Sequence, residues 1–285
     1  MISTLNKLPD GTIELMITIP WKRIKKAYDE ALTRLAAKVE IKGFRKGKAP
    51  KKLVEEKINK TSLYEEILKE LVPQVYLEAA KEQKIKPIIS PQIKILSLEE
   101  GKDWQIKATT CELPEVSLGD YKGEIKKILA KEKIWVPGTA KTPQDPQNQK
   151  NDKLEKIFKK LLEMAQVQIP AFLIQEEVNR MLARLINQTN KLGLTIEQYL
   201  ASMGKTSGKL REEYQKQAED SLKLELILFK IANEEKIEIP DAEIEKMIEA
   251  TPDEKIKKSL RTPSQKAYIG QLLRKRRVID NLLKL

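Results

Sequence analysis

Residues 43–50, Gly-Phe-Arg-Lys-Gly-Lys-Ala-Pro, have side chains suited to binding a charged partner. One aromatic ring stands among three cations, and residues 42–60 hold 8 Lys or Arg against 2 Glu. Such cations bind phosphates or acidic protein groups, while an exposed ring enters an apolar pocket or stacks on a base. The alternative is a solvated turn whose Phe44 packs against its own helices. Residue types alone leave both interpretations open.

The composition lacks several residue types that enzymes commonly use for catalysis. The chain has no His, which excludes Ser-His-Asp and Cys-His catalysis and His-ligated zinc. Its one cysteine, Cys111, can form neither an intrachain disulfide nor a Cys cluster for a metal, and its strand-like surroundings predict a half-buried position. Gly204-Lys205-Thr206 looks like the end of a phosphate-binding loop, but Tyr199 stands where that loop requires Gly. We therefore predict no catalytic residues, no metal and no cofactor.

The positive charge is concentrated at the two ends of the 285 residues. The net charge is +12, of which residues 1–60 contribute +8 and residues 253–285 contribute +7, so the middle carries −3. This distribution favours local contact with a polyanion. The run Arg274–Arg277 is either a solvated face near a helix C-terminus or a second contact with RNA or an acidic client. A chain of this length favours two domains, and 5% aromatic residues favour helices.

The first 113 residues are predicted to form a compact α+β domain. Alternating hydrophobicity over 12–19 predicts a half-buried strand, and a 3.6-residue pattern from Trp21 to Val39 predicts a helix leading into the basic turn. Turn residues and spacing predict the remaining elements: a short helix over 51–59 begun by Pro50, a helix from a Ser62–Glu65 capping box through Ala79 with a kink at Pro73, and strands over 92–98 and 103–113.

The rest of the chain is predicted to be a linker, 114–152, followed by an all-α domain, 153–285. Three Pro and almost no apolar residue occur over 136–149. No stretch is long and apolar enough to span a membrane, and the start lacks a signal-peptide core, so we expect a soluble cytoplasmic protein. An internal echo between residues 167–178 and 237–248 suggests two similar helical arms. Helices are expected over 153–165, 170–192, 195–203, 207–234, 240–250 and 263–284.

The run Gly43–Pro50 resembles the ribosome-binding loop of the trigger factor family, with seven defined positions in eight residues. Leu63–Leu68 and Lys86-Pro87 also resemble that family's third helix and its exit. The resemblance implies an elongated chain, with an α+β N-terminal ribosome-binding domain and an all-α C-terminal chaperone domain bearing helical arms. It assigns ribosome binding to Gly43, Phe44, Arg45, Lys46, Gly47, Lys48 and Pro50.

One departure from the family concerns its FKBP-like prolyl isomerase domain, which is inserted between those two parts. Residues 129–152 are too few for such a domain, so we expect no isomerase activity. The resemblance then implies an ATP-independent chaperone that docks on protein and ribosomal RNA of the large subunit near the exit tunnel. It would hold unfolded or nascent polypeptides there.

Flexible apolar side chains suit varied clients, so six residues are candidates to line the client-binding surface, although ordinary packing between helices is the alternative. They are Met164, Phe172, Met181, Met203, Phe229 and Met247. Two other functions stay open: a basic RNA-binding or ribosome-assembly protein, and a prolyl isomerase in a divergent segment. The free protein can be a monomer or a homodimer.

Overall fold

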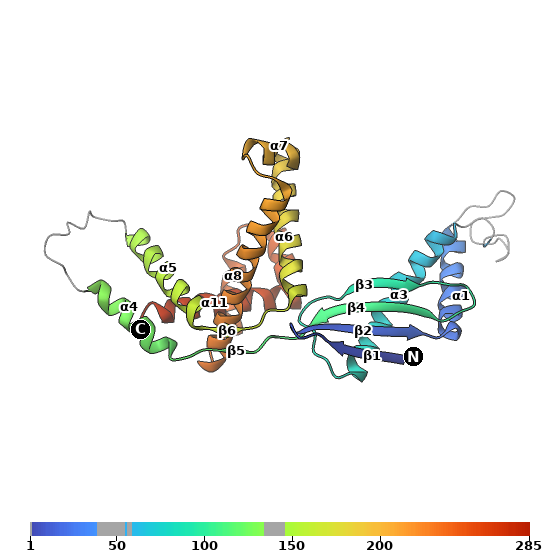
Figure 1. Ribbon diagram of the computed structural model, residues 1–285, viewed down its shortest axis with the longest axis horizontal. Helices are drawn as coiled ribbons and strands as arrows, with labels where there is room; N and C mark the ends of the chain where they lie inside the picture. The colour runs from blue at the N-terminus through green and yellow to red at the C-terminus, as the bar shows by residue number, and fades with distance from the viewer. Residues whose placement is uncertain (1, 39–54, 56–58, 134–145) are drawn as a thin grey trace. The chain divides into compact units, whose positions relative to one another are not determined.

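A computed structural model describes residues 2–38, 55, 59–133 and 146–285, which form two compact units (Figure 1). The first unit comprises Met1–Leu113 together with Pro170–Leu173, and the second comprises Pro114–Ile169 and Ile174–Leu285. The first is α+β and the second is mainly helical, which confirms the predicted fold class.

A four-stranded antiparallel sheet in the order β1-β2-β4-β3 forms one layer of the first unit. Alternate residues of β2 and β4 point to one face and are buried, with Leu15 opposite Ala108, and Ile17 opposite Ile106. This period of two is the pattern that predicted strands here. The strands are β1 (Ile2–Lys7), β2 (Thr12–Ile19), β3 (Gln92–Ser97) and β4 (Trp104–Cys111).

Two helices, α1 (Trp21–Lys38) and α3 (Lys60–Glu82), cover that buried face. Ile24 and Ala31 of α1 and Ile67 and Val75 of α3 join the strand residues in one core. Trp104 closes one end of this core, with its ring edge-to-face against Tyr64 at 5.5 Å between centroids. The core therefore holds the two helices side by side on the sheet.

Some local predictions for this unit were wrong. Helix α3 begins two residues before Ser62, because the side chain of Asn59 accepts the backbone N–H of Thr61 and caps it. Strand β1 was missed because most of its side chains are exposed at the sheet edge and its alternation is weak. Cys111 is fully buried, not half-buried, and burial raises the pKa of its thiol to about 11. The predicted helix over 51–59 falls almost entirely outside the described residues.

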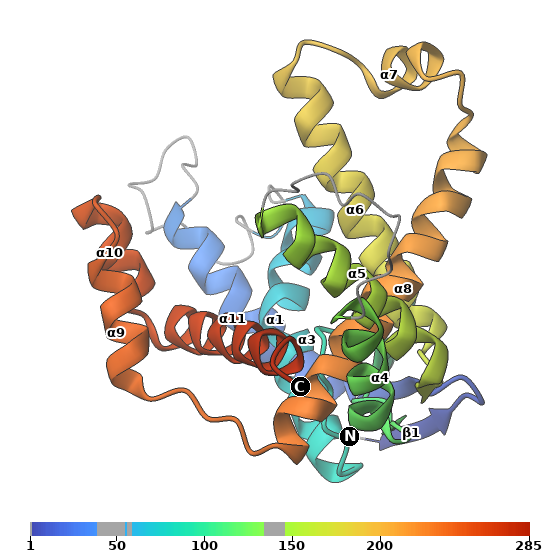
Figure 2. The same cartoon turned by 90° about the vertical axis from the view of Figure 1, so that its left-hand side faces the viewer.

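The second unit has a helical body and two arms, visible from the side in Figure 2. In the body, α4 and α5 pack against the second half of α8 and the end of α11, around buried Ile125, Ile157, Ile227 and Val278. A short antiparallel ribbon pairs Val116 with Val167. The body elements are α4 (Tyr121–Lys133), β5 (Val116–Ser117), α5 (Pro146–Met164) and β6 (Gln166–Val167).

Each arm has a small core of its own. The first arm packs Leu185, Leu200 and Leu210 from three successive helices. The second packs Ile244 and Ile248 against Ile269. The first arm is built from α6 (Ala171–Lys191), α7 (Ile196–Ser202) and the start of α8 (Ser207–Glu234), and the second from α9 (Asp241–Glu249), α10 (Glu254–Leu260) and the start of α11 (Pro263–Leu282).

The helix predictions from residue 170 onward are confirmed within two residues, except that α10 was missed. Helix α10 has seven residues and buries none of them, so it leaves no hydrophobic period to detect. Where a linker was expected over 114–152, residues 121–133 and 146–152 are helical, and 134–145 lie outside the described residues. Within the described part of the chain, no helix is long and apolar enough to cross a membrane.

Candidate functional site

The basic motif at residues 43–50 lies outside the described residues, so the structure shows its support and not the motif itself. That support is the pair of helices α1 and α3. Arg23 near the start of α1 pairs with Glu78, and Arg34 near its end pairs with Glu66 and Glu70. This order makes the helices antiparallel, so the end of α1 and the start of α3 lie at the same end of the pair.

Hydrogen bonds and ion pairs join the two helices. The guanidinium of Arg23 donates to both carboxylate oxygens of Glu78, at 2.5 and 2.8 Å, and this bidentate bond lowers the pKa of Glu78. Tyr28 donates its hydroxyl hydrogen to Glu55 at 2.6 Å. Burial, and then this contact, raises the pKa of Tyr28. Glu55 is thus bound to α1 through Tyr28, and Asn59 caps the start of α3.

Three further lysines on α1 lie exposed, and no ion pair joins them to the described residues: Lys22, Lys25 and Lys26. The acidic side chains of α3 nearest α1 are taken by the two arginines. The described hairpin therefore adds positive charge to the basic segment that it carries.

The six candidate client-binding residues differ in exposure and lie on different helices. Met203 and Met247 are 53% and 47% exposed, on the first and second arms respectively, and Phe229 of α8 is also exposed. Met164 and Met181 are half-buried. Phe172 is only 8% exposed.

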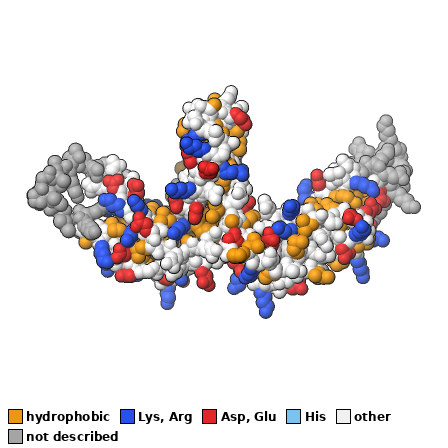
Figure 3. Space-filling view, in the orientation of Figure 1, with side chains coloured by type: hydrophobic (Ala, Val, Ile, Leu, Met, Phe, Trp, Pro, Cys, Tyr) orange, Lys and Arg blue, Asp and Glu red, His pale blue; other side chains and the backbone are white. Residues whose placement is uncertain are grey.

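An apolar groove of about 480 Å³ lies in the first arm, and the sequence did not indicate it. Leu182, Leu200 and Leu210, from three different helices, form its floor, while Lys205 and Arg211 stand at its rim. Figure 3 shows hydrophobic side chains on this arm among charged ones. Exposed large apolar side chains continue along the end of α6 and beyond, at Ile186, Leu192 and Leu194. Sequence reasoning looked for Met and Phe, whereas most of this surface is Leu and Ile.

The Gly204-Lys205-Thr206 run has a structural role in the same arm. Gly204 has φ +62°, the left-handed conformation that ends α7. Lys205 pairs with Glu213 at 2.5 Å, and the hydroxyl of Thr206 accepts the backbone N–H of Lys209 to cap α8. These contacts give all three residues a structural role in the connection between α7 and α8, so a bound nucleotide is not needed to explain their presence.

Two of the four basic residues at 274–277 hold the second arm onto the body. Arg274 donates to the backbone carbonyl of Ile237 and to the side chain of Asn233, each at 2.7 Å. Arg277 donates to the carbonyl of Glu238 and pairs with Glu243 at 2.5 Å. Both arginines therefore fasten the connection between α8 and α9, a role that neither sequence interpretation of this run included.

Within the described ranges, no three Asp, Glu or Cys side chains gather closely enough to hold a metal ion. The candidate surfaces in the described residues are the helical hairpin with its exposed lysines on the first unit and the apolar patches on the arms of the second.

Comparisons with known proteins identify the family of this chain. Residues 1–135 match the family model for bacterial trigger factor protein, and residues 143–284 match the model for its C-terminus. A trigger factor of Staphylococcus epidermidis is 37% identical over 128 residues, which cover 45% of this chain and 30% of that protein. A trigger factor of Staphylococcus aureus strain Newman is 38% identical over the same share. The chain thus covers less than a third of the length of these curated relatives.

A solved structure of the trigger factor chaperone, from work on promiscuous substrate recognition in folding and assembly, aligns over 100% of this chain and 99% of that chain. The TM-score is 0.65 at 17% identity, which shows a shared fold. Since the two family models together match nearly every residue, apart from 136–142 and Leu285, the chain belongs to the bacterial trigger factor family.

Proposed function

We propose that this protein is an ATP-independent chaperone that docks beside the exit tunnel of the ribosome and holds emerging polypeptides without isomerising them. The observation that carries the proposal is the family's ribosome-binding motif, Gly43–Pro50, between two antiparallel helices that are joined by ion pairs. Because the supporting helices are already packed on the sheet, they lose little conformational entropy when the motif binds. Docking in the cytoplasm then raises the concentration of the chaperone around each new chain.

The docking contact divides into two kinds of interaction. Arg45 and Lys46, with the exposed lysines of α1, supply a salt-sensitive attraction to ribosomal RNA and acidic protein groups. Phe44 supplies an apolar anchor of the kind that dominates binding energy at interfaces. Gly43, Gly47, Lys48 and Pro50 shape and extend the same contact.

Holding is assigned to the exposed apolar surfaces of the arms, in particular the groove of the first arm, Met203 and Met247. Several weak apolar contacts delay aggregation and release the client without nucleotide hydrolysis. The roles of Lys205 and Thr206 within the arm support independence from ATP. The lack of isomerase activity is supported by the two family matches, which leave residues 136–142 between them.

The docking proposal is tested by co-sedimentation with ribosomes. Intact protein is compared with a Phe44→Ala/Arg45→Ala/Lys46→Ala variant. The matched control, Leu192→Ala/Lys191→Ala/Arg211→Ala, also removes one large apolar side chain and two exposed cations, but from the first arm. We expect the loop variant to bind at least about tenfold more weakly, because an interface anchor contributes more than about 1 kcal/mol and each cation adds to it. The control should bind like the intact protein.

Equal binding by all three proteins would defeat the docking assignment. Tight binding of free RNA that is unaffected by Phe44→Ala would instead favour a basic RNA-binding protein. Holding is tested separately by light scattering of a denatured client, in which a Met203→Ser/Leu200→Ser variant should protect less well. Measurable proline isomerisation of a model peptide would overturn the claim that the protein only holds its clients.

A further inference from the structure

One face of α11 combines exposed apolar side chains with cations. Tyr268, Leu272, Lys275 and Arg276 follow one another at spacings that place them on the same side of a helix. Tyr268 is 59% and Leu272 44% exposed, and Arg276 is exposed beyond them. We call these four residues the α11 stripe.

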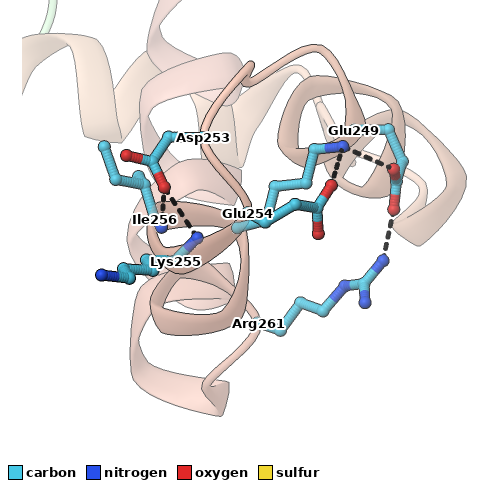
Figure 4. Close-up of polar contacts among 7 residues, drawn as sticks. Glu249, Asp253, Glu254, Lys255, Ile256 and Arg261 are labelled. Atoms are coloured by element: carbon cyan, nitrogen blue, oxygen red, sulfur yellow. Dashed lines mark hydrogen bonds and ion pairs between the residues drawn. The ribbon is translucent and has the colours of Figure 1, made fainter.

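The acidic groups around the stripe are already used inside the arm. Glu243 pairs with Arg277 and Glu245 pairs with Lys266. Glu249 pairs with Lys257 and with Arg261, and Figure 4 shows its contact with Arg261. These pairs bind α9 to α10 and α11, so their carboxylates are not free to neutralise the remaining cations.

Most of the other acidic side chains of this region also form hydrogen bonds or ion pairs. Asp253 accepts the backbone N–H groups of Lys255 and Ile256 and so caps α10, and Glu254 binds Lys257 at 2.9 Å. Asp280 pairs with Lys150 at 3.4 Å. Among the described residues 241–282, Asp241 is the one carboxylate outside such contacts.

Five cations of the arm have neither an ion pair nor a side-chain hydrogen bond to any described residue, and Figure 4 shows the side chain of Lys255 turned away from the neighbouring acids. Apolar side chains lie among them, since Met247 and Ile256 are exposed as well as the stripe. The arm surface is therefore apolar and positively charged together. The five cations are Lys246, Lys255, Lys258, Lys275 and Arg276.

We propose that the second arm binds client segments in which acidic residues flank large apolar ones. The inference rests on the proposed holding function and assigns it a client class. An aliphatic or aromatic client side chain buries the apolar surface of Tyr268 and Leu272, and its acidic neighbours meet Lys275 and Arg276. RNA would satisfy the cations but would leave the aliphatic surface of Leu272, Met247 and Ile256 without an apolar partner.

The test uses three short peptides with an uncharged dye, identical in their Leu and Phe positions and carrying Glu, Gln or Lys between them. Fluorescence anisotropy measures binding to the whole protein at low and high salt. We expect the Glu peptide to bind about tenfold more tightly than the Gln peptide at low salt, and the difference to shrink as salt rises. Lys275→Gln/Arg276→Gln should reduce that ratio to about twofold.

The matched control is Lys209→Gln/Lys216→Gln, which removes the same charge from exposed positions on α8. It should keep the full preference for the Glu peptide. Equal loss in both variants would mean that net charge and not the stripe selects the peptide, and would overturn the proposal. Equal binding of all three peptides would also overturn it, with holding itself left intact.

Two further outcomes separate the proposal from its alternatives. Tyr268→Ala/Leu272→Ala should weaken all three peptides and leave their ratio unchanged, because it removes the apolar contact alone. If a single-stranded RNA displaces the Glu peptide at lower concentration than the unlabelled peptide itself, the surface is an RNA site and the client assignment fails. If no peptide binds and aggregation is not delayed, the holding function fails with it.

Discussion

Arg274 should contribute more to the stability of the second unit than any surface arginine normally does. Its Nε donates to the part-buried carbonyl of Ile237, and its terminal nitrogen donates to Asn233. The guanidinium also lies 5.8 Å from the ring centroid of Phe229. All three partners belong to α8 or its exit, so Arg274→Ala removes the contacts that join α11 to the start of the second arm.

The magnitude follows from these contacts. A charged donor to a part-buried carbonyl contributes about 1.5 kcal/mol, and the more exposed bond to Asn233 contributes about 0.5 to 1 kcal/mol. The contact with Phe229 adds about 0.5 to 1 kcal/mol. We therefore expect Arg274→Ala to lower the free energy of unfolding by about 3 kcal/mol, or the melting temperature by about 6 to 12 °C in a unit of this size.

Circular dichroism at 222 nm during urea and thermal unfolding measures this change. Arg276→Ala is the matched control, because it removes the same side chain from an exposed position of the same helix. Arg274→Lys should fall between the two, since an ammonium keeps the charge but cannot reproduce both hydrogen bonds. Trypsin should also cut faster after Lys236, which is exposed beside the released carbonyl of Ile237.

The reasoning is refuted if Arg274→Ala and Arg276→Ala unfold within about 0.5 kcal/mol of each other, which is the range of ordinary surface substitutions. A loss of trypsin resistance without a change in the main transition would limit the effect to opening of the second arm. That result would show that the arm unfolds as a separate unit.

Three other perturbations test the packing. Asn59→Ala should destabilise the first unit by about 1 kcal/mol and Ser62→Ala hardly at all, as followed by the fluorescence of Trp21 and Trp104, because Asn59 is the cap of α3. Ile248→Ala, at a fully buried position, should cost about 2 to 4 kcal/mol in chemical unfolding, whereas exposed Met247→Ala should cost under about 0.5 kcal/mol. Burial raises the pKa of the Cys111 thiol from 9.0 to about 11, so its contribution to stability is complete below pH 9 and falls as pH rises toward 11. The stability difference between the intact protein and Cys111→Ala should shrink over that range, and a constant difference would contradict the assignment.

The sequence alone determined the features that depend on neighbours along the chain. Alternation over 12–19 predicted β2, and apolar spacing predicted α6, α8 and α11 almost to the residue, because strand and helix periods are local properties. The motif Gly43–Pro50 indicated the family, which the matches to residues 1–135 and 143–284 confirm. These signals needed no knowledge of how the helices pack.

Tertiary structure decided which side chains remain free to bind a partner. Arg274 and Arg277 look alike in sequence to Lys275 and Arg276, yet the first two hold the connection after α8, whereas Lys275 is half-buried with no ion pair to a described residue and Arg276 is exposed. Phe172 and Phe229 are equally apolar, but one is buried and the other exposed. The physical reason is that burial and ion pairing arise between residues distant in sequence, whose meeting depends on the packing of whole helices and not on the residue types nearby.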